Sequence, residues 1–155
     1  MNESNPALVG EGVTALILEV FRLNGRLLAA GDRLVAGLGL SSARWQVLGA
    51  IALAGTPQPV AHLARSIGLN RQGVQRIVNE LADEDILAFR DNPHHRRAKL
   101  VVMTAKGRAA YEAANQLQKP WVDALSRGLA VEDVTACLRL IETLRVRLEA
   151  EADPE

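Results

Sequence analysis

The chain has 155 residues, of which 48% are hydrophobic and 23% charged, and its 18 Lys and Arg residues balance its 18 Asp and Glu residues. This composition is typical of one ordinary globular unit, and the sequence has no low-complexity tract or internal repeat. The longest apolar run, residues 47–55, falls far short of the roughly 20 residues that a membrane span needs, and the polar N-terminus does not have the pattern of a signal peptide. The single cysteine can form no internal disulfide, which is typical of a reducing compartment. We therefore expect a cytoplasmic protein without a membrane partner.

The first predicted element is one long helix over residues 12–38. Apolar residues recur in it at three- and four-residue steps, which is the spacing of one helix face. Gly25 and Gly31 interrupt the series, so we expect a bend near one of them. The apolar positions are Val13, Leu16, Ile17, Val20, Leu23, Leu27, Leu34 and Leu38.

A second helix is predicted to begin at Ser41 or Ser42. Ser41 or Ser42 stands where a hydroxyl oxygen can accept a hydrogen bond from a free amide of the first turn. The following segment, residues 55–59, has the sequence GTPQP, and its two prolines cannot continue a helix. We therefore expect this segment to be a connector.

Residues 60–79 predict two short helices joined by a turn at Gly68, where a residue without Cβ adopts positive φ at little cost. Each helix has one apolar stripe, so the two should pack against each other. The stripes are Val60, Leu63, Ala64 and Ile67, and then Val74, Ile77, Val78 and Leu81. Asn70 is placed to cap the second helix, which would leave the positive end of the helix dipole facing outward, where a phosphate would bind.

The outer face of this second helix carries residues suited to reading DNA. These are Asn70, Arg71, Gln72, Gln75 and Arg76, and no acidic residue joins them on the exposed face through Asn79. Arg pairs with guanine, and Asn or Gln with adenine, in the major groove. The pattern predicts a recognition helix for double-stranded DNA. The alternative is a helical hairpin whose polar face is only solvated.

Residues 86–104 change to extended character and predict a β-hairpin with a basic tip. Asn92-Pro93 begins the turn, and the tip carries His94, His95, Arg96, Arg97 and Lys99. Residues 65–108 hold nine basic and five acidic side chains, a local charge of +4 of the kind that phosphate binding requires. A basic ribbon beside a recognition helix can reach the minor groove, although the charges of such a hairpin can also be merely solvated.

Two helices are predicted to follow the hairpin. The first begins after Thr104 and extends to about Arg127, with a kink or break at Pro120. The second covers residues 131–150 and has a clean apolar stripe. Its members are Val134, Leu138, Ile141, Leu144 and Leu148.

Taken together, these segments resemble the MarR family of winged-helix repressors. Residues 40–52 are similar to the second helix of the family, residues 60–87 to its helix-turn-helix, and residues 92–107 to its wing. The wing is the most specific match. The family pattern of Asp-x-Arg, three residues and then Leu-x-Leu-Thr falls here on His95, Arg97, Val101, Met103 and Thr104, of which Arg97 and Thr104 agree.

Two positions depart from the family pattern. His95 replaces an acidic residue that helps to brace the wing in the family, so the bracing of this loop is in question. Asp85 stands where the family ends the recognition helix with Gly. Asp tolerates the left-handed conformation, but after Asp83 and Glu84 it adds a third acid at the negative end of a helix dipole. We expect this helix end to be less stable than usual.

The resemblance implies a fold that is mainly α-helical with a small β-hairpin wing. Residues 1–155 would form a single unit, with a winged helix-turn-helix DNA-binding lobe over residues 41–106 and dimerisation helices over residues 12–38 and 108–150. It implies a homodimeric repressor whose recognition helices lie about 34 Å apart and select an inverted repeat. The alternatives are a monomer that folds the outer helices onto its own core, and a protein-interaction module without DNA binding.

The family also implies a small aromatic or anionic effector, bound between the dimer helices and the DNA-binding lobe. Arg22, Arg44 and Trp45 lie in the segments that would line this crevice, and a guanidinium beside an indole suits a phenolic carboxylate. The alternative places Trp45 in the core and Arg44 on the surface.

No other chemistry is indicated by the sequence. We expect Cys137 to be a buried structural thiol, because nothing near it in sequence would activate a thiolate. Adjacent histidines such as His94 and His95 point apart on a strand, and only His62 remains, so no metal site is expected. No nucleophile and base pair or phosphate-binding loop appears, so we expect neither an enzyme nor a cofactor.

Overall fold

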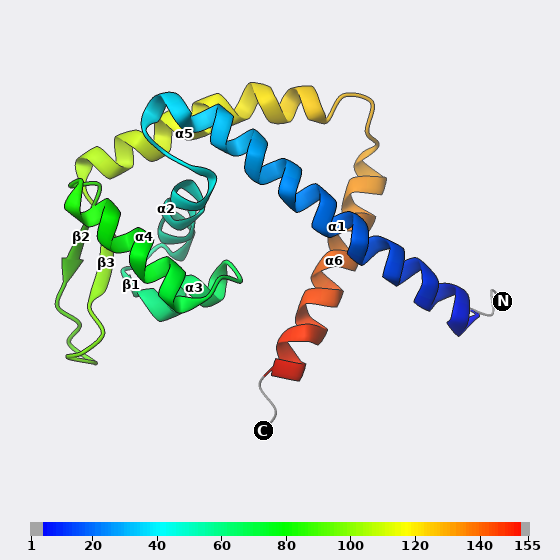
Figure 1. Ribbon diagram of the computed structural model, residues 1–155, viewed down its shortest axis with the longest axis horizontal. Coiled ribbons are helices and arrows are strands. Elements are labelled where there is room, and N and C mark those ends of the chain that lie inside the picture. The colour runs from blue at the N-terminus through cyan, green and yellow to red at the C-terminus, as the bar shows by residue number, and fades with distance from the viewer. Residues whose placement is uncertain (1–4, 153–155) are drawn as a thin grey trace. The chain divides into compact units, whose positions relative to one another are not determined.

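The computed structural model describes residues 5–152, and the chain divides into two compact units, Met1–Gln118 and Lys119–Glu155 (Figure 1). The first unit holds α1 (Pro6–Val35), the short 3₁₀ helix η1 (Ala36–Leu38), α2 (Ser42–Ala54), β1 (Gln58–Pro59), α3 (Val60–Ser66), α4 (Arg71–Asp83), β2 (Leu87–Arg90), β3 (Leu100–Met103) and most of α5 (Ala105–Leu125). The second unit holds the end of α5 and α6 (Val131–Ala152). The predicted fold class, mainly helical with a small β wing, is confirmed.

The helix α1 begins earlier than predicted and is continuous through both glycines. Asn5 caps it, since the Asn5 Oδ1 accepts a hydrogen bond from the Ala7 amide at 3.1 Å, and Pro6 follows in the first turn, where a missing N–H costs nothing. Gly31 is buried because α2 lies against it, and an added Cβ would collide with the Ser42 hydroxyl oxygen. Gly31 therefore allows α1 and α2 to approach closely.

The sheet has three antiparallel strands in the order β1-β3-β2. The predicted hairpin is confirmed, with Arg90 opposite Leu100. Residues 55–59 were predicted to be only a connector. This is wrong for the last two residues, because Gln58 and Pro59 form an edge strand in which Gln58 pairs with Val101. Proline is tolerated at a sheet edge, where one side of the strand has no partner that needs its N–H.

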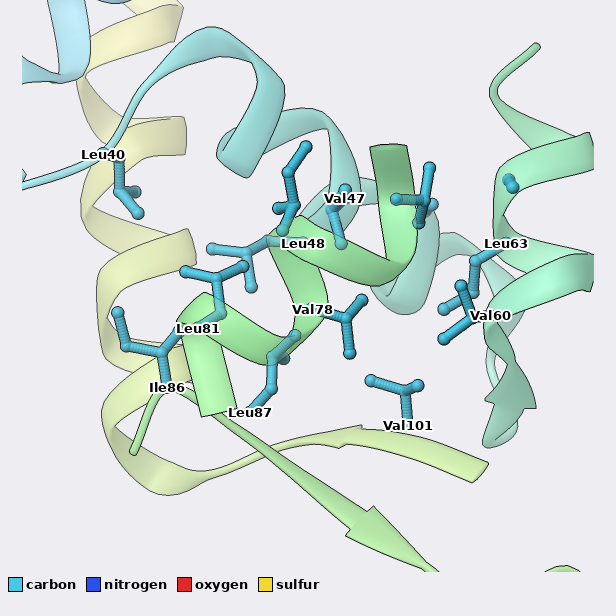
Figure 2. Packing of buried hydrophobic residues seen from close by; sticks show 14 of the residues in the cluster. Leu40, Val47, Leu48, Val60, Leu63, Val78, Leu81, Ile86, Leu87 and Val101 are labelled. Carbon is cyan, nitrogen blue, oxygen red and sulfur yellow. The ribbon is translucent and has the colours of Figure 1, made fainter. Parts of the chain in front are cut away.

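The core of the first unit surrounds α4. Figure 2 shows Val78 of α4 between Val47 of α2 and the strand residue Val101, and Leu81 of α4 between Leu48 of α2 and Ile86. Seven of the eight residues predicted for the two stripes of the helix-turn-helix are buried, and the eighth, Ile67, packs against them partly exposed. Because the inner face of α4 is held by α2, α3 and the sheet, its outer face has a fixed direction.

The turns on either side of α4 adopt the backbone that the sequence predicted. Gly68 has φ of 67°. Within residues 5–152, Asp85 is the only residue other than glycine with positive φ, at 59°. The left-handed residue lets the Ile86 amide return to the Leu81 carbonyl oxygen at 2.9 Å, so the chain leaves α4 directly into β2.

In the second unit Pro120 lies inside α5, so of the predicted kink or break the break is wrong and the kink stays a prediction. Cys137 was predicted to be buried and is exposed, because α6 has no buried residue among those of known exposure, 131–151. No helix within residues 5–152 is long and apolar enough to cross a bilayer.

Asp85 provides a test of the α4 terminus. Replacing Asp85 with Gly should raise the free energy of unfolding by about 0.5–1 kcal/mol, because glycine removes the cost of the left-handed conformation but adds backbone entropy to the unfolded chain. Urea denaturation measures the change. Asp83→Gly is the matched control, and it should lower stability, because residue 83 is right-handed helix. Equal losses of stability in the two variants would contradict this account of the turn.

Candidate nucleic-acid interface

The outer face of α4 presents the predicted residues to solvent. Asn70 caps the helix, with its Oδ1 accepting a hydrogen bond from the Gly73 amide at 2.7 Å, as predicted. Asn70, Arg71, Gln72 and Arg76 are exposed and Gln75 is partly buried. The side-chain Nε2 of Gln75 donates to the Asn79 Oδ1 at 3.0 Å, and this hydrogen bond orients the Gln75 carboxamide on the outer face. The helix therefore offers cations and amides along one side.

The wing is braced by Asn92 rather than by an acidic residue. The Asn92 Nδ2 donates to the Ala98 carbonyl oxygen at 2.9 Å, and its Oδ1 accepts from the His94 amide at 3.0 Å. The backbone closes the same loop, because the Ala98 amide donates to the His95 carbonyl oxygen at 3.0 Å. These bonds close the loop without the side chain of His95. Sequence reasoning used Asn92 only as a turn signal, although an Asn side chain commonly bonds the backbone two residues further on.

The wing and the recognition helix border one hollow of about 320 Å³. Arg71 and Gln75 line it from α4, while Arg97 and Lys99 line it from the wing. The rest of its wall comes from Phe89 of β2, Pro59 of β1, Ala98 and the start of α3. The predicted basic ribbon and the predicted recognition face therefore lie side by side on one surface. His94, His95 and Arg96 are exposed in the same loop, outside this hollow.

The far end of α4 carries an ion-pair network that sequence reasoning missed. The Arg44 guanidinium of α2 binds both carboxylate oxygens of Glu84, at 2.7 and 3.1 Å, and lies 3.5 Å from the Glu80 carboxylate. The hydrogen bond from Arg44 lowers the pKa of Glu84, and the same bond raises the pKa of Arg44. From α5, Lys106 donates to the Glu84 carbonyl oxygen at 2.7 Å. Two cations thus hold this helix end, Arg44 through two carboxylates and Lys106 through a carbonyl oxygen.

The three residues predicted for an effector site have different surroundings. Arg44 is occupied by Glu84 and Glu80, and its side chain is only 19% exposed. Arg22 pairs with Glu19 at 3.0 Å on the exposed side of α1. Trp45 packs partly buried against the core, as its alternative placement expected. Neither the hollow beside the wing nor the outer face of α4 contains any of the three predicted residues, so their effector role stays a prediction.

Comparisons with known proteins identify the family. A family model described as MarR family matches residues 38–98. An uncharacterized protein of Mycobacterium tuberculosis, Rv2011c, is 35% identical over 108 residues, which are 70% of this chain and 74% of that protein. The chain belongs to the MarR family. The resemblance stated from the wing and helix-turn-helix motifs is thereby confirmed.

Solved MarR-family structures share the fold of this chain. The M. tuberculosis regulator MosR in complex with DNA is 22% identical, covers 83% of this chain and 97% of its own, and superposes with a TM-score of 0.65. CouR from Rhodococcus jostii RHA1, bound to p-coumaroyl-CoA, is 20% identical, covers 90% of this chain and 93% of its own, and gives a TM-score of 0.68. At these identities the likeness establishes the fold.

The brace at Asn92 leads to a prediction about the wing. Asn92→Ala should speed exchange of the His94 amide proton about fivefold, which corresponds to loss of a hydrogen bond worth about 1 kcal/mol. Water-exchange NMR measures this rate. Asn92→Asp is the matched control, because it keeps the oxygen that accepts from His94 and removes only the donor to Ala98. Unchanged His94 exchange in Asn92→Ala would show that the side chain does not hold the loop.

Proposed function

We propose that this MarR-family chain is a homodimeric, sequence-specific regulator of transcription that acts as a repressor at an inverted-repeat operator. The observation that carries the proposal is the hollow that Arg71 and Gln75 of α4 share with Arg97 and Lys99 of the wing. A duplex lying on that surface would meet both elements at once. The local charge of +4 over residues 65–108 supplies the attraction to phosphate.

The side chains of α4 and those of the wing contact different grooves of the duplex in this proposal. The side chains of α4 enter the major groove, where Arg71 and Arg76 meet guanine or phosphate and Gln72 and Gln75 meet adenine. Asn70 caps the first turn of α4, and the positive end of the helix dipole there faces a phosphate oxygen. The wing lies in the next minor groove, whose negative potential attracts arginine. Its contacts come from His94, His95, Arg96, Arg97 and Lys99.

The apolar surface of the outer helices supports a dimer. On α1, Phe21 is 69% exposed and Leu8 64%, and on α6, Val131 is 76% and Leu148 65% exposed. Apolar patches of this kind on a single chain are typical of subunit interfaces. In the proposal the segments 12–38 and 108–150 join two chains about a two-fold axis, and the lobe over residues 41–106 contacts DNA. The symmetry of the protein then dictates the symmetry of the operator.

In this proposal the dimer represses transcription while it is bound to the operator, and an effector releases it from the DNA. A dimer that covers about one turn of DNA on each side of its axis competes with polymerase for the same duplex, so repression needs no further contact. The fold likeness to CouR, solved with p-coumaroyl-CoA, supports an aromatic or anionic effector. A promoter fusion with and without the gene, and with aromatic acids added, tests both points. Lower expression in the absence of the protein would mark an activator instead.

The wing's part in binding is tested by two arginines of one hairpin. Arg97→Ala should weaken binding to every duplex, and the slope of log affinity against log salt should become less steep by about 1. Arg90→Ala is the matched control, because Arg90 lies on β2 but borders a different hollow, which no residue of α4 lines. Titrations at several salt concentrations measure the slopes. Equal effects of the two substitutions would remove the wing from the interface.

Base reading is tested on α4. Gln75→Ala should relax the preference at one base position of the operator by about 1–3 kcal/mol, because a bidentate contact to adenine is lost. Selection of bound sequences from random duplexes measures the preference, and Gln46→Ala, an exposed glutamine on α2, is the control. An identical selected sequence for Gln75→Ala would exclude a direct contact. If the unaltered protein selects no sequence and binding does not depend on salt, the chain is a docking module and not a DNA-binding regulator.

A further inference from the structure

The first turn of α2 is fixed to α1 by a buried serine. The Ser42 amide donates to the Asp32 carboxylate at 2.7 Å, and the Ser42 hydroxyl donates to the Leu28 carbonyl oxygen, also at 2.7 Å. Ser42 is only 6% exposed, and it fits because Gly31 has no side chain at the crossing. Hydrogen bonds of this length to a carboxylate and a carbonyl leave the two helices little freedom to slide.

Two residues further on, the same turn holds the end of α4. Arg44 makes a bidentate contact with both carboxylate oxygens of Glu84. Its Nη1 also lies 3.4 Å from the Gly39 carbonyl oxygen, in the segment that joins η1 to α2. A bidentate guanidinium contact fixes direction as well as distance. The first turn of α2 thus links α1 to the recognition helix through residues that are only two apart in sequence.

Glu84 also receives a contact from the other side. Lys106 in the first turn of α5 donates to its backbone carbonyl oxygen. Next to it, the Thr104 hydroxyl donates to the Asp85 carbonyl oxygen at 2.6 Å and accepts from the Gly107 amide at 3.0 Å. The end of α4 is therefore held by α2 on one side and by the start of α5 on the other.

We infer that the Arg44–Glu84 pair sets the angle of α4 relative to α1 and so determines which spacing between operator half-sites the dimer accepts. Arg44 is then a positioning residue: it touches no base, but it controls where the outer face of α4 points. This inference rests on the proposed function, since spacing has meaning only for a dimer on DNA. It differs from simple stabilisation of a helix end, because only a positioning role changes spacing preference.

The substitutions for the test keep size and remove charge. Arg44→Gln and Glu84→Gln should each reduce the preference for the selected spacing over spacings one or two base pairs longer or shorter by about five- to tenfold, which is within the range of coupling between sites in proteins. Binding to a single half-site should change less than the spacing preference does. The double variant should be no worse than either single variant, since both remove the same contact.

Arg90→Gln is the matched control. Arg90 lies on β2 and borders a hollow that no residue of α4 lines, so this variant loses a guanidinium that is not paired with α4. It should keep the spacing preference. A spacing preference that survives Arg44→Gln, or an equal loss in Arg90→Gln, would overturn the inference.

A second measurement needs no DNA. Spin labels at Arg26→Cys on α1 and Asn79→Cys on α4, in a chain with Cys137→Ser and diluted with unlabelled protein, report the distance between the two helices by electron double resonance. Arg44→Gln should broaden this distance distribution. An unchanged distribution would overturn the inference even if the unaltered protein bound DNA, whereas a broadened distribution in a protein that binds no duplex would support the positioning of α4 and reject the proposed function.

Discussion

The burial of one face of α4 is the constraint on which the rest of the structure depends. Val74, Val78 and Leu81 are almost completely removed from water. Burial of such a side chain contributes about 1.5–3 kcal/mol to folding, and most of this free energy would be lost for each of them if the helix turned outward. The helix has only one apolar stripe, so fixing this face leaves its polar side chains facing solvent. The wing follows from the same packing, because β3 contributes Val101 to the core and thereby places the hairpin next to the start of α4.

Features that depend on local pattern could be predicted from the sequence. The cap at Asn70 and the turn at Gly68 each follow from the residue type at one position and its neighbours, whereas the left-handed Asp85 followed from the family resemblance. The strand β1 could not be predicted, because Gln58 and Pro59 have no strand pattern and become a strand only when β3 lies beside them. Whether a short segment pairs depends on the partner and not on its own composition.

The Arg44 network shows the same limit at the far end of α4. Arg44 and Glu84 are 40 residues apart, so no spacing rule relates them. The resemblance placed Arg44 in a segment that would line an effector crevice, a role that stays a prediction, and the structure adds its ion pairs with Glu84 and Glu80. The hydrogen bonds of Asn92 were missed because the family pattern directed attention to His95. A family pattern identifies the positions that it specifies, and the contacts of the other positions come only from the structure.

The central claim is that α4 and the wing occupy neighbouring grooves of one duplex. Dimethyl sulfate footprinting tests it in a single experiment, because this reagent methylates guanine N7 in the major groove and adenine N3 in the minor groove. On the selected operator, the account predicts protected guanines within each half-site and protected adenines immediately beside them, in a pattern repeated about the centre of the site. Protection of one groove alone, or a footprint without symmetry, would contradict it.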